Sequence, residues 1–412
     1  MKCSTILLSL SSSTIIHFSQ ATVYATFSKS LLIPTTDDDP VPYGPGNPCP
    51  CLDSSLCEPV SQSRFDKELF LFHVPGYGTF NEEWRQYNWD RITSIALWQY
   101  MDADAEFYCY AKSLGVRIFV QASPDAAAYA GSNQTAKDAW VANVVSDVTG
   151  YFADGINMDT EDAIAPMNRT SQLGLTQMAQ SARDAFDSTP GLSDVLVTFD
   201  VGWAPNVDGR FYDYAGLAAV SDFFVMMDYD MASYIFGACL ATPNSPPPQV
   251  LDGVLKWLSV ENVTPEKLVL AVPWYGRSYE CAAGTAPDAR YCPLANPAPW
   301  RDCNCTDAST GVLPYGLTYN SEIPHVRDEI LQNSYYNTVD ENGTVTQNWF
   351  EDLESLSIKY AFVNIYDLKG VGIWTPNFAD YGNQTDYTDD SLVPSETVEM
   401  WKAVSTIPFG GE

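Results

Sequence analysis

Apolar residues follow two alternating patterns along this chain. Short, almost continuous apolar runs rich in β-branched and aromatic residues predict buried strands. These runs cover residues 68–73, 92–98, 116–122, 154–159, 195–201, 223–229, 267–274 and 370–374. Between several of them, apolar residues recur every three or four positions, as in 140–148 and 175–186, which predicts amphipathic helices. Strands alternating with helices in this way predict an α/β fold, the (β/α)8 TIM barrel.

An open, doubly wound parallel sheet is the alternative fold for the same pattern. Its usual functions depend on a Gly-rich dinucleotide fingerprint or a phosphate-binding P-loop. The sequence contains neither motif. The barrel is therefore the favoured prediction.

One connection between the predicted strands is unusually long. About 95 residues separate the runs 267–274 and 370–374, far more than a single crossover helix needs. The segment contains Cys281, Cys292, Cys303 and Cys305 in turn-rich sequence. We expect a disulfide-stapled insertion at about 280–350 with a small sheet of its own.

The N-terminal region is expected to precede the folded domain. Residues 1–25 combine a Lys, an apolar run broken by serines and small residues at a suitable cleavage point, which predicts a signal peptide. Residues 26–48 are expected to be a linker, because much of this segment is polar and rich in Pro and Gly. The domain is expected to cover residues 49–412.

Sequons and cysteines favour a secretory route. Six Asn-x-Ser/Thr sequons occur, at Asn133, Asn168, Asn262, Asn304, Asn342 and Asn383. Nine of the ten cysteines remain if Cys3 leaves with the signal peptide, and such usage favours disulfides. The odd number predicts one thiol that is free or paired outside the chain, and Cys109, alone among apolar residues, is a candidate core thiol. No metal site is expected, because His73 and His325 lack ligand spacing to any cysteine.

Charge and hydropathy exclude several kinds of partner. The net charge of -31 and the pI near 4.1 argue against binding to nucleic acid or to an anionic membrane. The sequence contains no uninterrupted apolar stretch of 18 residues, the length that would predict a membrane span. We expect no cofactor and a monomeric protein.

Polar side chains at the end of the fourth predicted strand indicate a site. Asn157, Asp159 and Glu161 alternate with apolar residues, so their side chains should share one face of the strand, whereas Asp162 should point the other way. A polar row on a buried strand is costly unless it has a function. Carboxylates that share a partly buried barrel mouth cannot all ionise easily, so one can serve as a general acid.

Other strand ends add candidate binding residues, since barrel active sites lie at the C-terminal ends of the strands. They are Met227, Tyr229 and Asp230 after the sixth strand, Trp274 and Tyr275 after the seventh, Trp374 after the eighth, and Trp203 after the fifth. For Trp203, Trp274 and Tyr275, a place in the core is as reasonable as a place in the site.

Three of these motifs resemble those of family 18 glycoside hydrolases, the chitinase class. "DGINMDTE" (154–161) resembles the signature Asp-Gly-x-Asp-x-Asp-x-Glu, with Asn157 where most members have Asp. "MDYD" (227–230) is similar to the family's Met-x-Tyr-Asp, and Trp374 matches the Trp at the end of the eighth strand. The resemblance runs from about Cys49 to about Trp401, so it implies that the predicted domain is a catalytic barrel.

The resemblance also implies a mechanism. Family 18 enzymes retain the anomeric configuration without a protein nucleophile, because the 2-acetamido carbonyl of the substrate attacks the anomeric carbon. Glu161 would protonate the glycosidic oxygen and later activate water. Asp159 would orient the acetamido N–H, and Tyr229 would hold the carbonyl oxygen. The expected substrate-binding residues are Asn157, Met227, Asp230, Trp374, Trp203, Trp274 and Tyr275, while Asp154 and Gly155 are expected to be structural.

The departure at Asn157 carries its own expectation. An Asn is neutral and offers a hydrogen-bond donor to an ionised Asp159 without adding a like charge. Asp159 and Glu161 should then titrate as a coupled pair rather than as part of a triad of acids.

The expected function is hydrolysis of β-1,4 linkages between N-acetylglucosamine residues, in the chitobiose core of Asn-linked glycans and in chitooligosaccharides. The expected partners are oligosaccharides that contain N-acetylglucosamine, met in a lysosome, a vacuole or outside the cell. The alternatives are a secreted chitinase acting on polymeric chitin and a chitin-binding, lectin-like protein without turnover.

Overall fold

A computed structural model describes residues 31–32, 42–60, 62–74, 82–98, 104–131, 133–231, 239–297, 313–314, 324–382 and 393–410. The predicted signal peptide, with Cys3, lies outside the described residues, as do most of the predicted linker, two further cysteines and two of the sequons. These further cysteines and the sequons are Cys303, Cys305, Asn304 and Asn383.

Eight parallel strands close into a barrel in the order β1-β13-β7-β6-β5-β4-β3-β2. They are β1 (Glu68–His73), β2 (Ser94–Leu97), β3 (Arg117–Gln121), β4 (Gly155–Met158), β5 (Leu196–Gly202), β6 (Phe223–Met227), β7 (Leu268–Pro273) and β13 (Gly370–Trp374). Each lies on one of the predicted apolar runs, so the (β/α)8 prediction is confirmed. Since all eight strands are parallel, their C-terminal ends meet at one rim of the barrel.

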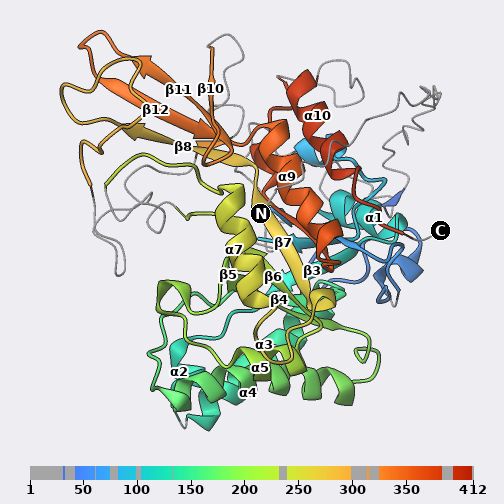
Figure 1. The fold of residues 1–412 in the computed structure, drawn as a ribbon. Helices are drawn as coiled ribbons and strands as arrows, with labels where there is room; N and C mark the ends of the chain where they lie inside the picture. The colour runs from blue at the N-terminus through green and yellow to red at the C-terminus, as the bar shows by residue number, and fades with distance from the viewer. Residues whose placement is uncertain are drawn as a thin grey trace, which may run out of the picture.

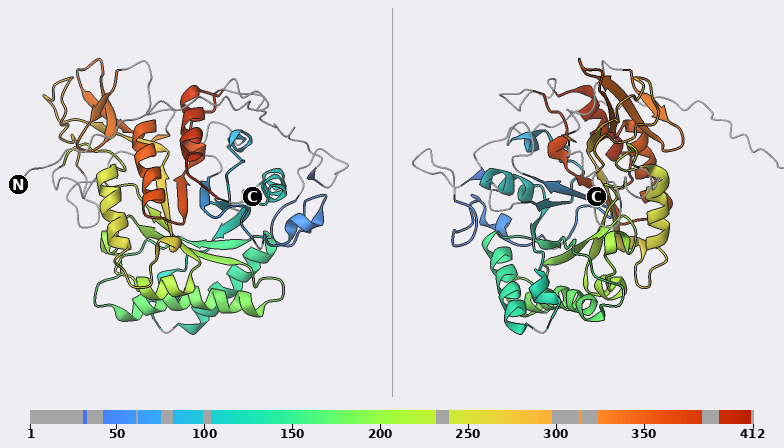
Figure 2. Two further views of the ribbon diagram at one scale, coloured as in Figure 1. Left: turned by 45° about the vertical axis from the view of Figure 1, so that its right-hand side comes forward. Right: turned by 90° about the vertical axis from the view of Figure 1, so that its left-hand side faces the viewer.

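Helices surround the barrel (Figures 1 and 2). They are α1 (Ala105–Ser113), α2 (Ala126–Tyr129), α3 (Gln134–Gly150), α4 (Arg169–Ser188), α5 (Tyr214–Val220), α7 (Pro247–Trp257), α9 (Leu353–Ile365) and α10 (Ser395–Val404). Short 3-10 turns are η2 (Ser54–Cys57), η3 (Glu83–Gln86), η5 (Val207–Gly209), η6 (Pro265–Lys267) and η8 (Pro376–Phe378). Of the helices described, none has the length and apolar character that a membrane crossing requires.

Aromatic side chains fill the inside of the barrel. Phe70, Phe119 and Phe223 pack edge to face, with ring centroids 5.2 to 6.4 Å apart. This filling explains Gly155, because a Cβ built there would lie 2.2 Å from the Phe119 ring. The absence of a side chain at residue 155 therefore lets β4 pass the ring, in agreement with the structural role expected for Gly155.

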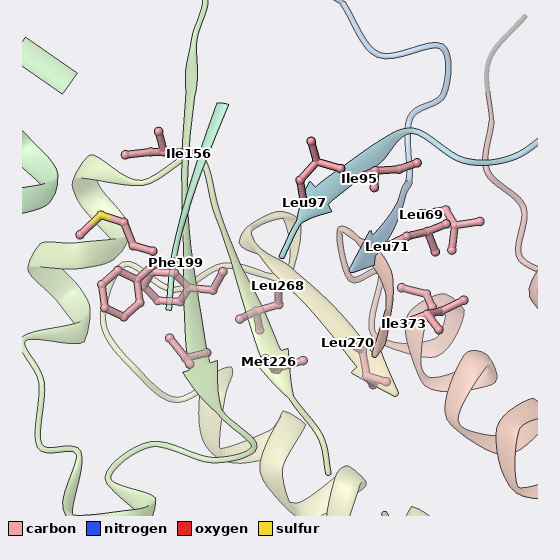
Figure 3. Close-up of a cluster of buried hydrophobic side chains, with 14 of the residues drawn as sticks. Leu69, Leu71, Ile95, Leu97, Ile156, Phe199, Met226, Leu268, Leu270 and Ile373 are labelled. Atoms are coloured by element: carbon pink, nitrogen blue, oxygen red, sulfur yellow. The ribbon is translucent and has the colours of Figure 1, made fainter. Parts of the chain in front are cut away.

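A second apolar layer lies between the strands and the helices. Ile156 and Met158 of β4 belong to this layer and are fully buried. Figure 3 shows part of it, with Ile156 of β4 and labelled side chains of β1, β2, β5, β6, β7 and β13. Because neighbouring residues of a strand point to opposite faces, Asn157 points into the barrel, as the alternation predicts.

The segment between β7 and β13 contains an antiparallel five-stranded sheet in the order β10-β11-β12-β8-β9. Its strands are β8 (Tyr275–Glu280), β9 (Leu313–Pro314), β10 (Val326–Asp328), β11 (Asn333–Val339) and β12 (Val345–Phe350). The sheet projects away from the barrel in Figure 1. Its first strand begins one residue after Trp274, slightly before the predicted start at about residue 280, because β8 continues almost directly from β7.

Two of the described disulfides close short loops, and a third joins segments that are far apart in the sequence. Cys49 is bonded to Cys57, Cys51 to Cys109, and Cys281 to Cys292. The expectation that Cys109 is a core thiol is therefore wrong: helix α1 brings it against Cys51, 58 residues earlier in the chain. A further cysteine, Cys239, is also disulfide-bonded.

The described end of the predicted linker is packed against the barrel's helices. The Tyr43 ring lies 4.8 Å from that of Tyr108 and 5.5 Å from that of Tyr151, measured between centroids. Its hydroxyl donates to the carbonyl of Tyr151 at 2.9 Å. Ordered packing thus begins before Cys49, because an aromatic side chain there covers the joint between α1 and the end of α3.

A buried ion pair closes the N-terminal end of β4. Lys112 Nζ lies 2.6 Å from Asp154 Oδ1, and both side chains are 1% exposed. Asp154 also accepts from the backbone N–H groups of Val60 at 2.6 Å and Ile118 at 2.7 Å. Asp154 is therefore structural, as expected, since its carboxylate joins three segments of chain.

Candidate active site

Asn157 lies inside the barrel near the C-terminal end of β4. It is 1% exposed, and its Nδ2 donates to Asp200 Oδ1 at 2.8 Å and to Thr198 Oγ1 at 3.1 Å. Both partners belong to β5, whose Thr198 is the register partner of Asn157. The expected donation to Asp159 is not present, because the neighbouring strand supplies both acceptors.

Asp159 follows β4 on the same face as Asn157. Burial raises the pKa of its carboxyl to about 7; the nearby Glu161 carboxylate adds to the rise, and Arg210 opposes it. Asp159 Oδ1 is buried, and no hydrogen-bond partner for it occurs in the described part of the chain. A carboxyl with this pKa changes its protonation state near neutral pH.

Glu161 is at the rim of the barrel, two residues further on. Its side chain is 46% exposed, and its Oε2 forms an ion pair with the guanidinium of Arg210. The Arg210 side chain is only 5% exposed and comes from the loop after β5. Glu161 thus combines access from solvent with a fixed cationic neighbour, which is the arrangement of a group that meets a ligand.

Asp162 is turned away from Glu161, as strand alternation predicts. Its Oδ2 accepts from the hydroxyl of Tyr129 at 2.7 Å, and its carbonyl accepts from the hydroxyl of Tyr212 at 2.7 Å. Both partners pack outside the barrel mouth. Asp162 therefore anchors the loop after β4 and is a suitable control for Glu161.

Tyr229 and Trp374 form an aromatic wall beside the acids. Their ring centroids are 6.4 Å apart, and the Trp374 ring also lies 4.9 Å from Trp98 and 5.1 Å from Phe72. The peptide bond after Trp374 is cis. Burial, together with nearby Tyr275 and the acids, raises the pKa of Tyr229 well above its ordinary value, so Tyr229 keeps its hydroxyl proton and can donate it in a hydrogen bond. Met227, 9% exposed, lies two residues earlier on the same face.

Asp230 is held by residues of the insertion's first strand. Tyr275 donates its hydroxyl to Asp230 Oδ1 at 2.8 Å, and Arg277 forms an ion pair with the same oxygen. Its backbone N–H donates to Asn244 Oδ1 at 2.7 Å. The Asp230 side chain is 43% exposed. Tyr275 is 1% exposed, so its main contribution is to position Asp230.

The structure does not bring Trp274 into the site. The Trp274 side chain is fully buried and packs edge to face on Trp401, with centroids 4.7 Å apart. Its Nε1 donates to the hydroxyl of Tyr360 at 3.4 Å. Trp274 is therefore a core residue, because strand alternation turns it outward toward the helices. Trp203 is 6% exposed, and Lys256 Nζ lies 5.5 Å from its ring, which leaves little of its surface for a ligand.

Two functional candidates, Asp200 and Arg210, were missed by reasoning from the sequence. Asp200 is the acidic residue of the run "VLVTFDV" and is 2% exposed. Burial and then the charge of Asp159 raise its pKa well above the ordinary value, while the hydrogen bond from Asn157 opposes the rise. An acid on an inward position of the predicted fifth strand was a usable signal for Asp200. Arg210 lies in a loop, where no periodicity indicates which side chain turns inward.

The described residues contain one group of potential metal ligands, Cys49, Cys51 and Cys57. All three sulfurs are in disulfides, so they are not available as thiolate ligands. The site at the barrel mouth is built instead from carboxyl, phenol, amide and guanidinium groups. Such a set serves proton transfer and hydrogen bonding.

The fold and this site are those of a family 18 glycoside hydrolase, and the chain belongs to that family. The model of glycosyl hydrolases family 18 matches residues 122–378. The match includes the carboxylate row of β4, the motif after β6 and Trp374.

Relatives with curated names agree. The di-N-acetylchitobiase of Rattus norvegicus is 34% identical over 361 residues, covering 86% of this chain and 92% of the relative. The di-N-acetylchitobiase of Homo sapiens is 31% identical over 364 residues, covering 87% of this chain and 89% of the relative.

Solved structures of chitinases share the fold. A Group IV chitinase of Ostrinia furnacalis, crystallised with allosamidin, superimposes with a TM-score of 0.64 at 18% identity, covering 83% of this chain and 98% of that one. A mutant class V chitinase of Nicotiana tobaccum, crystallised in complex with NAG4, has a TM-score of 0.61 at 14% identity. The match covers 82% of this chain and 98% of that one. At these identities the likeness concerns the fold alone.

Proposed function

We propose that this enzyme hydrolyses β-1,4 linkages between N-acetylglucosamine residues, in the chitobiose core of free Asn-linked glycans and in chitooligosaccharides. The observation that carries the proposal is the placement of Asp159 and Glu161 on one face at the end of β4, beside the neutral hydroxyl of Tyr229. The names of the relatives at 31 to 34% identity support the choice of substrate.

Glu161 is the proposed general acid and base. Its exposure lets a glycosidic oxygen approach, and a general acid must come within hydrogen-bond reach of the oxygen that it protonates. Because Arg210 holds the carboxylate in an ion pair in this structure, the substrate has to compete with that pair. Glu161 would give its proton to the leaving oxygen and then take one from the attacking water.

Asp159 and Tyr229 are the proposed grip on the substrate's acetamido group. The Asp159 carboxylate accepts the acetamido N–H, and the Tyr229 hydroxyl donates to the carbonyl oxygen. The carbonyl oxygen then forms a bond to the anomeric carbon as the glycosidic bond breaks, and the ionised Asp159 stabilises the positive charge on the resulting ring. Water later opens the ring and restores the acetamide. No carboxylate of the protein is needed as nucleophile.

Trp374 is the proposed floor for the sugar at the cleavage point, with Met227 and Asp230 at the edges. An aromatic face suits the apolar face of a pyranose ring. Trp374 is fixed for this role by its packing on Trp98 and Phe72. Trp203 has at most a minor place in such a subsite, given its low exposure.

Two alternatives are less well supported. The support for a secreted chitinase acting on polymeric chitin comes from the two chitinase structures described above. Their sequences are only 18% and 14% identical to this chain. A lectin-like protein without turnover is disfavoured by the presence of both Asp159 and Glu161, since a protein that only binds sugar does not need a general acid.

We further propose a secretory route to a lysosome, a vacuole or the cell exterior, and a monomeric state. The disulfides support the secretory route, because such bonds persist in oxidising compartments. So do the exposed asparagines of the four described sequons, Asn133, Asn168, Asn262 and Asn342.

The test of the proposed function is product analysis with purified protein. Chitobiose, chitotetraose labelled at one end, a free Asn-linked glycan, polymeric chitin and the glucose disaccharide cellobiose are supplied in parallel. We expect release of N-acetylglucosamine from chitobiose and from the reducing end of the glycan, and none from cellobiose, which lacks the acetamide. Cleavage of cellobiose, or a covalent sugar ester on an Asp or Glu, would contradict substrate assistance. Faster attack on the polymer than on the oligosaccharides would favour the chitinase alternative.

A further inference from the structure

Asp200 is a buried carboxyl beneath the site, and the mechanism proposed above does not use it. It lies on β5 two residues beyond Thr198, so both side chains point into the barrel. Asp200 Oδ1 accepts from Asn157 Nδ2 at 2.8 Å, and Thr198 Oγ1 accepts from the same nitrogen at 3.1 Å. The Asn157 amide is therefore held by two acceptors on one neighbouring strand.

The charges around Asp200 are unbalanced. Asp159 and Glu161 reach it from the end of β4, Arg210 from the loop after β5, and Tyr229 lies nearby on the β6 side. Arg210 already pairs with Glu161, and its effect on Asp200 is smaller than that of either acid. Two adjacent buried carboxylates that share so little positive charge do not both ionise easily.

We propose that Asp200 is a positioning residue that acts in its neutral, protonated form: it holds the Asn157 amide in place beside Asp159 and leaves Asp159 as the carboxyl that ionises. The proposal rests on the function proposed above for Asp159 and Glu161. A neutral carboxyl still accepts from Asn157 through its carbonyl oxygen. An ionised Asp200, in contrast, would oppose the negative charge that Asp159 needs when the oxazolinium-like ring forms.

This arrangement sets an amide of β4 beside an acid of β5. The family signature places an acid where this chain has Asn157, and here the Asp200 carboxyl lies 2.8 Å from the Asn157 amide. The cluster of acids near Asn157 therefore has three members, Asp159, Glu161 and Asp200, although only two of them come from the β4 motif.

The test compares two variants whose side chains have the same branching and the same number of heavy atoms. Asp200→Asn keeps an acceptor for Asn157 and is permanently neutral, so it should keep most of the wild-type kcat, with the acidic limb of the kcat/KM profile unmoved. Asp200→Leu removes the acceptor and should lose about 10-fold or more in kcat, with a smaller change in KM, because the Asn157 amide, two residues before Asp159 on the same face, loses one of its two acceptors and its fixed orientation. Rescue by Asn but not by Leu distinguishes positioning from simple filling of space.

Two results would overturn the proposal. A shift of the acidic limb to lower pH in Asp200→Asn would show that the wild-type residue is ionised, since removal of a buried negative charge lowers the pKa of Asp159. Wild-type kinetics in Asp200→Leu would show that Asn157 does not need Asp200. If Asp200→Leu does not fold, the position of the acidic limb of the kcat/KM profile in Asp200→Asn still shows whether the wild-type Asp200 is neutral.

Two controls separate this proposal from others. Asp228→Asn makes the same change at another fully buried carboxyl, which lies on the outer side of the strand near Lys359 of α9, and it should leave the profile unmoved. Glu161→Gln in the same assay tests the proposed site itself. Turnover that survives Glu161→Gln contradicts the proposed function, whereas unchanged turnover in Asp200→Leu alone contradicts only the role of Asp200.

Discussion

The guanidinium of Arg210, almost fully buried, is ion-paired with the carboxylate of Glu161, which is nearly half exposed. The pair joins the loop after β5 to the end of the neighbouring strand β4 at the mouth of the barrel. It also places a positive charge near Asp159 and Asp200, where it opposes the rise of their pKa values. Arg210 therefore acts on Glu161, Asp159 and Asp200.

Replacement of Arg210 by Gln should move the acidic limb of the kcat/KM profile to higher pH. Arg210 lowers the pKa of Asp159, so its removal raises that pKa, and Asp159 then ionises only at higher pH. The measurement is the pH dependence of kcat/KM on chitobiose. Arg169→Gln is the control, because Arg169 pairs with Asp213 and its side chain is 61% exposed. A limb that stays in place would contradict the charge effect assigned to Arg210.

Glu161→Gln should fold normally and lose about 10²-fold or more in kcat, the usual effect of removing an acid–base group. The amide keeps the size of the side chain but cannot give a proton to the glycosidic oxygen. Turnover of chitobiose and thermal unfolding are measured together. Asp162→Asn, whose side chain is held by Tyr129 on the other side of the strand, should keep near wild-type turnover.

Asn157→Asp should shift the pH optimum to higher pH. The new carboxyl would stand 2.8 Å from Asp200, at the distance now spanned by the amide hydrogen bond. Two carboxyls at this distance share a proton, because the ionised form of each raises the pKa of the other. Their added negative charge also raises the pKa of Asp159. Profiles of variant and wild type that superimpose after scaling would show that residue 157 is not electrostatically coupled to the acids.

Asp159→Asn should make the protein more stable at neutral pH while abolishing most activity. Burial raises the folded-state pKa of Asp159 to about 7, so ionisation of this group costs stability as pH rises from the ordinary Asp value, about 4, toward 7. The variant cannot ionise, so its advantage in Tm should be absent near pH 4 and grow toward pH 7. Asp252→Asn, at a carboxyl 54% exposed, should show no such trend.

Lys112→Met should lower the free energy of unfolding by about 3 kcal/mol or more, because it leaves Asp154 as an uncompensated charge in the interior. Lys256→Met is the matched control. Lys256 and Asp252 form a 2.6 Å pair with both side chains more than half exposed, and exposed pairs contribute at most about 1 kcal/mol. Denaturant unfolding of both variants gives the comparison, and equal losses would contradict the structural role of Asp154.

The sequence by itself determined the features that depend on local periodicity. Continuous apolar runs indicated all eight barrel strands, because a strand covered on both faces needs apolar side chains in both directions. The two-residue repeat placed Asn157, Asp159 and Glu161 on one face and Asp162 on the other, since alternation is a property of any strand. The same reasoning could have drawn attention to Asp200 on the fifth strand.

Only the tertiary structure decided which distant groups meet. Closure of the barrel places β5 beside β4, so Asn157 finds its acceptors on Thr198 and Asp200 rather than on Asp159. Docking of α1 brings Cys109 to Cys51. The Trp274 side chain, which points away from the barrel interior, is buried against Trp401. These contacts depend on the packing of elements far apart in the chain. A single sequence records the residue types for such contacts but not the neighbours they acquire, and those neighbours set the pKa values and orientations on which the chemistry depends.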